Sequence, residues 1–110
     1  MLIGAMNHPA ADVLSEIAWM REMKLEFIDL TLEPPGAATW KVRPADVRRA
    51  VRDAGMAVVG HTAYYLPFAN PFESIRRAAV EELRRCLDLF AEVGAKYTPC
   101  PPAQGIAETL

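Results

Sequence analysis

From Val58 to Tyr97 the chain reads VVGHTAYYLPFANPFESIRRAAVEELRRCLDLFAEVGAKY. The apolar run from Ala57 to His61 predicts a strand, and residues 62–71 form the linker to a long helix that ends at Gly94. A further strand is predicted to begin at Lys96 and to run to Thr98. The stretch therefore predicts one complete strand–helix–strand unit.

The long helix carries its own start signal and one apolar stripe. Asn70 and Glu73 have the pattern of an N-cap and its reciprocal partner, with Pro71 at the first helical position. Its predicted buried stripe consists of Ile75, Ala79, Leu83, Cys86, Leu87 and Phe90.

The same alternation extends toward the N-terminus. The upstream sequence predicts a strand from Leu2 to Met6, a helix from Ala11 to Met23, a strand from Phe27 to Leu32 and a helix from Pro44 to Gly55. Downstream, Ala103 to Leu110 are predicted to begin a fourth helix. Strand–helix repeats at this spacing imply right-handed crossovers and a parallel sheet. The predicted fold class is α/β, as one domain over residues 1–110. It corresponds to about three and a half units of a (β/α)8 barrel, or to a small flavodoxin-like sheet with an exposed edge.

Composition excludes several classes of function. The 110 residues include 12 Lys and Arg against 14 Asp and Glu, a net charge of −2, so nucleic acid held mainly by charge is not expected. No apolar stretch is long enough to span a membrane, and the N-terminus lacks a basic signal-peptide region. Cys86 and Cys100 do not make a disulfide framework, and we expect a cytoplasmic protein with reduced thiols.

Candidate site residues lie where predicted strands end, since α/β folds bind ligands beyond the carboxyl ends of their strands. These are Asn7, His8, Glu33 and His61, joined by Asp29, which shares a polar strand face with Glu33. Imidazole and carboxylate together can bind Zn²⁺ or Mn²⁺, and a carboxylate can take a proton next to a carbonyl. The same residues also allow structural interpretations: a solvated loop for Glu33, a turn for His8, a hydrogen-bonded strand end for His61 and an ion pair for Asp29.

The linker after the third strand carries Tyr64, Tyr65 and Phe68. Three aromatic side chains at the ligand-binding end of the sheet can stack on a sugar or a base, or can cover the top of the core. The sequence contains no glycine-rich phosphate loop, CxxC pair or HExxH motif.

The segment Val58 to Tyr97, together with EFIDLTLEPP from Glu26 to Pro35, resembles the xylose isomerase-like barrels. This superfamily includes sugar-phosphate isomerases and epimerases and apurinic endonuclease IV. The resemblance implies that His61 matches the third-strand histidine, a metal ligand in the endonuclease branch and a substrate-side residue in the isomerases. It places Asp29 at the acidic residue within strand two and Glu33 at the mouth of that strand. Tyr64 or Tyr65 matches the loop tyrosine.

The sequence departs from the family pattern in three places. Pro101 stands where the family has a fourth-strand histidine, and Lys24 stands where it has a glycine after the first helix. Strands five to eight, which supply most of the family's metal ligands and carboxylates, have no counterpart in these residues. The resemblance therefore implies the N-terminal part of a barrel, inactive alone, that we expect to pair as a homo-oligomer or to require a missing C-terminal half.

Three hypotheses follow. The first is a metal-dependent sugar or sugar-phosphate isomerase or epimerase that uses Mn²⁺, Zn²⁺ or Mg²⁺ in the complete barrel. In it Glu33 is catalytic, His61 binds substrate or metal, and Asp29, Tyr64, Tyr65 and His8 bind substrate. The second is a DNA-repair relative of endonuclease IV, and the third is a degenerate, non-catalytic half-barrel that oligomerises.

Overall fold

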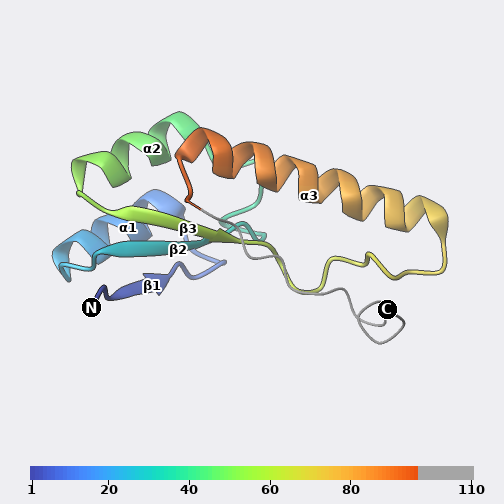
Figure 1. Ribbon diagram of the computed structural model, residues 1–110, viewed down its shortest axis with the longest axis horizontal. Helices are drawn as coiled ribbons and strands as arrows, with labels where there is room; N and C mark the ends of the chain where they lie inside the picture. Colours follow the sequence, from blue (N-terminus) through green and yellow to red (C-terminus); the bar gives the residue numbers. More distant parts are fainter. Residues whose placement is uncertain (97–110) are drawn as a thin grey trace.

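The computed structural model describes residues 1–96, which fold as a three-stranded sheet with a helix after each strand (Figure 1). The elements are β1 (Gly4–Met6), α1 (Val13–Glu22), β2 (Phe27–Thr31), α2 (Pro44–Asp53), β3 (Ala57–His61) and α3 (Glu73–Val93). The sheet is parallel throughout, in the order β1-β2-β3. The predicted α/β class with consecutive parallel strands is confirmed. No helix of the described residues is long and apolar enough to cross a membrane.

The predictions beyond β3 fall partly outside the described residues. The Lys96 backbone N–H donates to the Val58 carbonyl at 3.1 Å, so the chain returns beside β3 after α3. This is the point at which the sequence predicts a fourth strand. The rest of that strand, Pro101 and the helix predicted from Ala103 to Leu110 lie outside the described residues.

The two faces of the sheet differ in what covers them. Ile28, Leu30 and Val58 are buried beneath the helices, which lie on one side of the sheet (Figure 1). Because side chains alternate along a strand, the neighbours of these residues point to the other face. That open face carries Met6, Phe27, Asp29, Val59 and His61, and no helix of residues 1–96 covers it.

The first two helices follow the sequence closely. Val13, Ile17 and Met20 of α1 are buried, as their helical spacing predicts, and Asp12 caps the helix by accepting from the Ser15 backbone N–H at 3.0 Å. In α2 the first residue is Pro44, as predicted. Gly55 follows its C-cap with φ of 65°, in the predicted left-handed conformation.

The start of α3 corrects the sequence prediction. The helix begins at Glu73 with Phe72 as its N-cap, so Pro71 precedes the helix. Asn70 instead accepts the Phe72 backbone N–H at 2.9 Å, which caps the turn before the helix. The guanidinium of Arg76 donates to the carbonyls of Asn70 and Pro71, and these bonds fix the same turn.

The buried stripe of α3 also differs from the prediction at two positions, one near its start and one in its second half. Leu87 is 45% exposed, and Ile75 is exposed as well. Counted from Cys86, the positions three, four and seven residues later share its face of the helix, and Leu87 does not. The residues buried in α3 are Ala79, Cys86, Leu89, Phe90 and Val93.

Lys24 closes α1 in a left-handed conformation, with φ of 58°. A side chain with a Cβ is strained there, whereas glycine adopts this conformation freely. Lys24 is exposed, so replacing it removes no buried contact. We expect Lys24→Gly to raise the free energy of unfolding by about 0.5–1 kcal/mol, since the relief of strain exceeds the entropy that glycine adds to the unfolded chain. Urea denaturation measures this, and a loss of stability would contradict the strain at this position.

Candidate functional site

A histidine and a carboxylate meet on the open face of the sheet, near the carboxyl ends of β2 and β3. Thr31 is in register with His61, and Asp29 lies two residues earlier on β2. The ring Nδ1 of His61 lies 2.8 Å from Oδ1 of Asp29. The two side chains are 23% and 36% exposed, so both remain accessible from the open face. The structure thus brings together two residues that the sequence analysis treated separately, and the hydrogen-bond partner of Asp29 is His61.

This contact fixes which nitrogen of His61 is available. An ionised carboxylate only accepts hydrogen bonds, so the bond to Asp29 requires the proton on Nδ1. In the neutral ring, Nε2 then keeps a lone pair that can accept a proton, accept a hydrogen bond or bind a cation. The Asp29 carboxylate therefore orients His61 with Nε2 as its reactive atom.

Glu33 is held just beyond the end of β2. Its Oε2 accepts a hydrogen bond of 2.5 Å from the hydroxyl of Thr31, the residue in register with His61. Glu33 is partly exposed, so its carboxylate is accessible. Glu33 and the Asp29–His61 pair thus lie at the same end of the sheet, contributed by adjacent strands.

The linker after β3 brings aromatic rings to the same end. Tyr64 and Tyr65 contact edge to face, with ring centroids 5.4 Å apart and an interplanar angle of 81°. Partial desolvation of the phenol, followed by the charge of Glu33, a hydrogen bond with Glu33 and the charge of Tyr64, raises the pKa of Tyr65 above its ordinary value of 10.0. Both rings remain largely exposed. The loop therefore presents an accessible aromatic surface in contact with Glu33.

His8 lies in the turn after β1. Its ring Nδ1 accepts the backbone N–H of Ala10 at 3.1 Å, and its own backbone N–H donates to the Glu16 carboxylate at 2.6 Å. Both bonds hold His8 in the turn, as the structural interpretation of His8 as a turn residue expects. They leave Nε2 of His8 as the nitrogen that a ligand would meet.

Asn7 is named by the sequence analysis as a strand-end residue, but without a chemical role. It is fully buried, at 0% exposure, and its side chain bonds both backbone groups of Thr31. Its position directly after β1 was the available signal, because a polar residue buried at a strand end requires hydrogen-bond partners.

The described residues do not by themselves make a metal centre. Within residues 1–96 no group of three or more His, Cys, Asp and Glu side chains is arranged to hold an ion. Asp29 and His61 supply two donors, whereas a protein zinc site takes three or four protein ligands. A divalent cation at this point would need further ligands from outside the described part of the chain.

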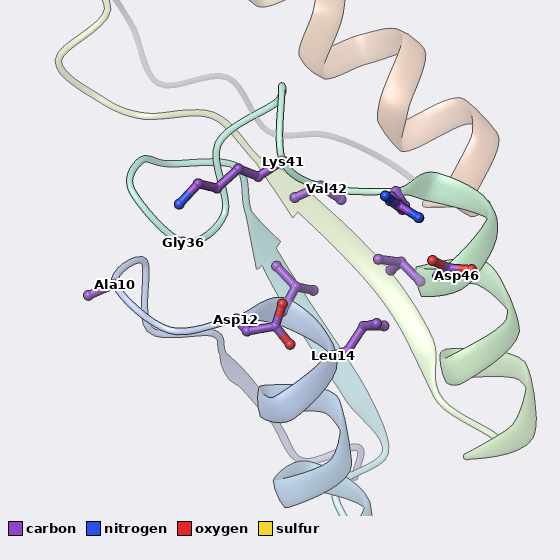
Figure 2. A pocket seen from close by; sticks show the side chains of 10 residues that line it. Ala10, Asp12, Leu14, Gly36, Lys41, Val42 and Asp46 are labelled. Carbon is purple, nitrogen blue, oxygen red and sulfur yellow. The ribbon is translucent and has the colours of Figure 1, made fainter.

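A recess of about 520 Å³ lies between the N-terminal ends of α1 and α2, and Figure 2 shows Asp12, Leu14, Asp46 and Lys41 around it. Asp12 is already engaged as the N-cap of α1. The recess is lined by two basic residues, Lys41 and Arg43, and by two carboxylates, Asp12 and Asp46, so the charges along its lining balance. None of the sequence-predicted site residues lines it, and we place the chemistry at the open face of the sheet.

Comparisons with known proteins bear on the family and the fold of the chain. Residues 17–108 match the family model described as xylose isomerase-like TIM barrel. No curated protein matches the chain. Among solved structures, the 3-keto-D-glucoside 4-epimerase of E. coli superposes with a TM-score of 0.68 at 21% identity, over 89% of this chain and 36% of that one. An L-ribulose 3-epimerase superposes with a TM-score of 0.69 at 15% identity, over 91% of this chain and 35% of that one.

These likenesses establish the fold alone, because sequence identities this low do not carry over an activity. The chain spans about a third of the length of each of these two structures. Its three parallel strands and following helices correspond to part of a closed barrel. The open face of the sheet is accordingly the face that lines the interior of such a barrel.

Proposed function

Since this chain belongs to the xylose isomerase-like TIM barrel family, we propose that it is the N-terminal part of a barrel that isomerises or epimerises a sugar or sugar phosphate. The observation that carries the proposal is the Asp29–His61 pair beside Glu33, at the carboxyl ends of adjacent strands. The two superposed structures, both sugar epimerases, support the substrate class.

Each residue has a chemical role in this proposal. The Glu33 carboxylate takes the proton from a carbon or hydroxyl next to the substrate carbonyl. His61, oriented by Asp29, bonds a substrate oxygen through Nε2. Tyr64 and Tyr65 stack on the apolar face of the sugar and shield the site from water. His8 contributes a further polar contact from the end of β1.

A divalent ion, Mn²⁺, Zn²⁺ or Mg²⁺, belongs to the proposal only in the completed barrel. Such an ion would polarise the substrate's carbonyl and hydroxyl oxygens. Because the described residues supply at most the Asp29–His61 pair, the remaining ligands must come from elsewhere.

The chain alone is proposed to be inactive, because the open face leaves the site uncovered. That face exposes Met6, while Leu2 and Ile3 are exposed just before β1. Among residues 1–96, uncovered apolar surface beside the edge of β1 favours association with a second copy of the chain or with a separate C-terminal half. Sedimentation equilibrium separates these two alternatives, and reading the gene past Leu110 tests the second directly.

The proposal is tested first by ligand binding to the chain itself. L-ribulose at millimolar concentration, added to isotopically labelled protein, is expected to shift the NMR signals of His61, Glu33 and Tyr65. His61→Ala is expected to abolish these shifts, because the oriented Nε2 acceptor is lost. Glu26→Gln, at the opposite end of β2, serves as the matched control and keeps them.

Two results would contradict the proposal. One is an absence of shifts at the open face both in this chain and in a folded protein that contains the completed barrel. The other is tight, salt-dependent binding of abasic DNA, which would favour the endonuclease-like alternative despite the net charge of −2.

A further inference from the structure

The buried amide of Asn7 acts as a side-chain extension of the sheet. Its Nδ2 donates to the Thr31 carbonyl at 3.2 Å, and its Oδ1 accepts the Thr31 backbone N–H at 2.9 Å. The strand β1 ends at Met6, so backbone groups of β1 no longer pair with β2 at this point. The side-chain amide of Asn7 bonds the Thr31 N–H and carbonyl in place of a β1 backbone group. The backbone of Thr31 is therefore held on the side that faces β1.

The hydroxyl of Thr31, whose backbone is fixed by Asn7, in turn holds the Glu33 carboxylate. A threonine hydroxyl has one proton to donate, and here it goes to Oε2 of Glu33 at 2.5 Å. Thr31 is fully buried, so water does not compete for this bond. A short bond from a neutral donor to a carboxylate is among the stronger hydrogen bonds in proteins. The bond fixes the position of the Glu33 carboxylate beside the end of β2.

We propose that Asn7 and Thr31 are positioning residues, which hold the Glu33 carboxylate against the Tyr65 phenol at the carboxyl end of β2. The arrangement runs from the buried Asn7 amide through the Thr31 backbone and hydroxyl to Glu33. Only the statement that this carboxylate meets a sugar rests on the proposed function. The positioning itself is a property of this chain.

The test uses Thr31→Val, which removes the hydroxyl and keeps the branched shape. The readout is the pKa of Tyr65, followed by NMR of ¹³C-labelled tyrosines, with Tyr65→Phe to assign the signal. Glu33 helps to raise this pKa through its negative charge and through its hydrogen bond with the phenol. Loss of the Thr31 hydroxyl releases Glu33, so the pKa of Tyr65 is expected to fall toward its ordinary value. Thr31→Ser keeps a hydroxyl and is expected to leave the pKa raised.

Thr39→Val is the matched control, because the Thr39 hydroxyl makes the same kind of bond to Glu82, at 2.6 Å, elsewhere in the fold. It is expected to leave the Tyr65 pKa unchanged. A folded Thr31→Val protein whose Tyr65 pKa stays the same or rises would overturn the proposal. If Thr31→Val does not fold, Thr31→Ala is read by the same criterion. Because the measurement needs no sugar, it stands independently of whether L-ribulose binds.

Discussion

Phe90→Ala is expected to lower the free energy of unfolding by about 3–5 kcal/mol, the range for deleting a buried aromatic ring. Phe90 is 2% exposed, and its ring lies directly against the backbone of Gly60 on β3. A Cβ at position 60 would overlap this ring, so the absence of a side chain there is what allows α3 to approach the sheet. Removing the ring leaves a cavity that the backbone of β3 cannot fill.

Urea denaturation followed by circular dichroism measures this loss, with Leu87→Ala as the matched control on the same helix. Leu87 is 45% exposed, so its truncation is expected to cost about 0.5 kcal/mol or less. A domain of this size has a total stability of about 5–15 kcal/mol, and Phe90→Leu provides a milder variant if the alanine variant is unfolded. Equal losses at positions 87 and 90 would contradict the described packing of α3.

Glu33→Gln is expected to reduce sugar epimerisation by about 10²-fold or more in the protein that contains the completed barrel, as is typical when a general base is removed. Glutamine has nearly the same shape, and its side-chain carbonyl can still accept the Thr31 hydroxyl. The variant therefore keeps the geometry and loses the ability to take a proton. The effect is expected in kcat rather than in KM.

The assay measures the rate at which the two epimeric sugars interconvert, and Glu26→Gln is the control. Glu26 precedes β2 at its opposite end, where its Oε1 accepts from the Ile3 backbone N–H at 3.3 Å. Its replacement removes one carboxylate without touching the proposed site. Unchanged turnover in Glu33→Gln would exclude Glu33 as the base and would leave it the role of a solvated loop residue.

Much of the fold could be predicted because its local signals agree with one another. Pro44 and Gly55 mark the two ends of α2, and the alternation along Phe27–Thr31 separates a buried from an open face. The errors lie where local signals compete. Asn70 and Pro71 form a good capping pattern, yet the chain uses them in a turn that Arg76 stabilises through its guanidinium.

The candidate site was predictable as a set of residue types at strand ends, but not as a set of contacts. His61 and Glu33 follow from the rule that ligands bind at the carboxyl ends of parallel strands. Their partners depend on register: Thr31 lies beside His61, which places Asp29 within reach of the imidazole. A shift of one residue would send Asp29 to the helix-covered face and break the pair.

The sequence by itself determined the α/β class, the order of elements and the polar face of β2, because these depend on periodicity and on turn residues along the chain. Only the tertiary structure decided that Asn7 bonds Thr31 and that His61 meets Asp29. These contacts join the end of β1 to β2, and β2 to β3. Such distances are fixed by the packing of elements against one another, which no local pattern specifies.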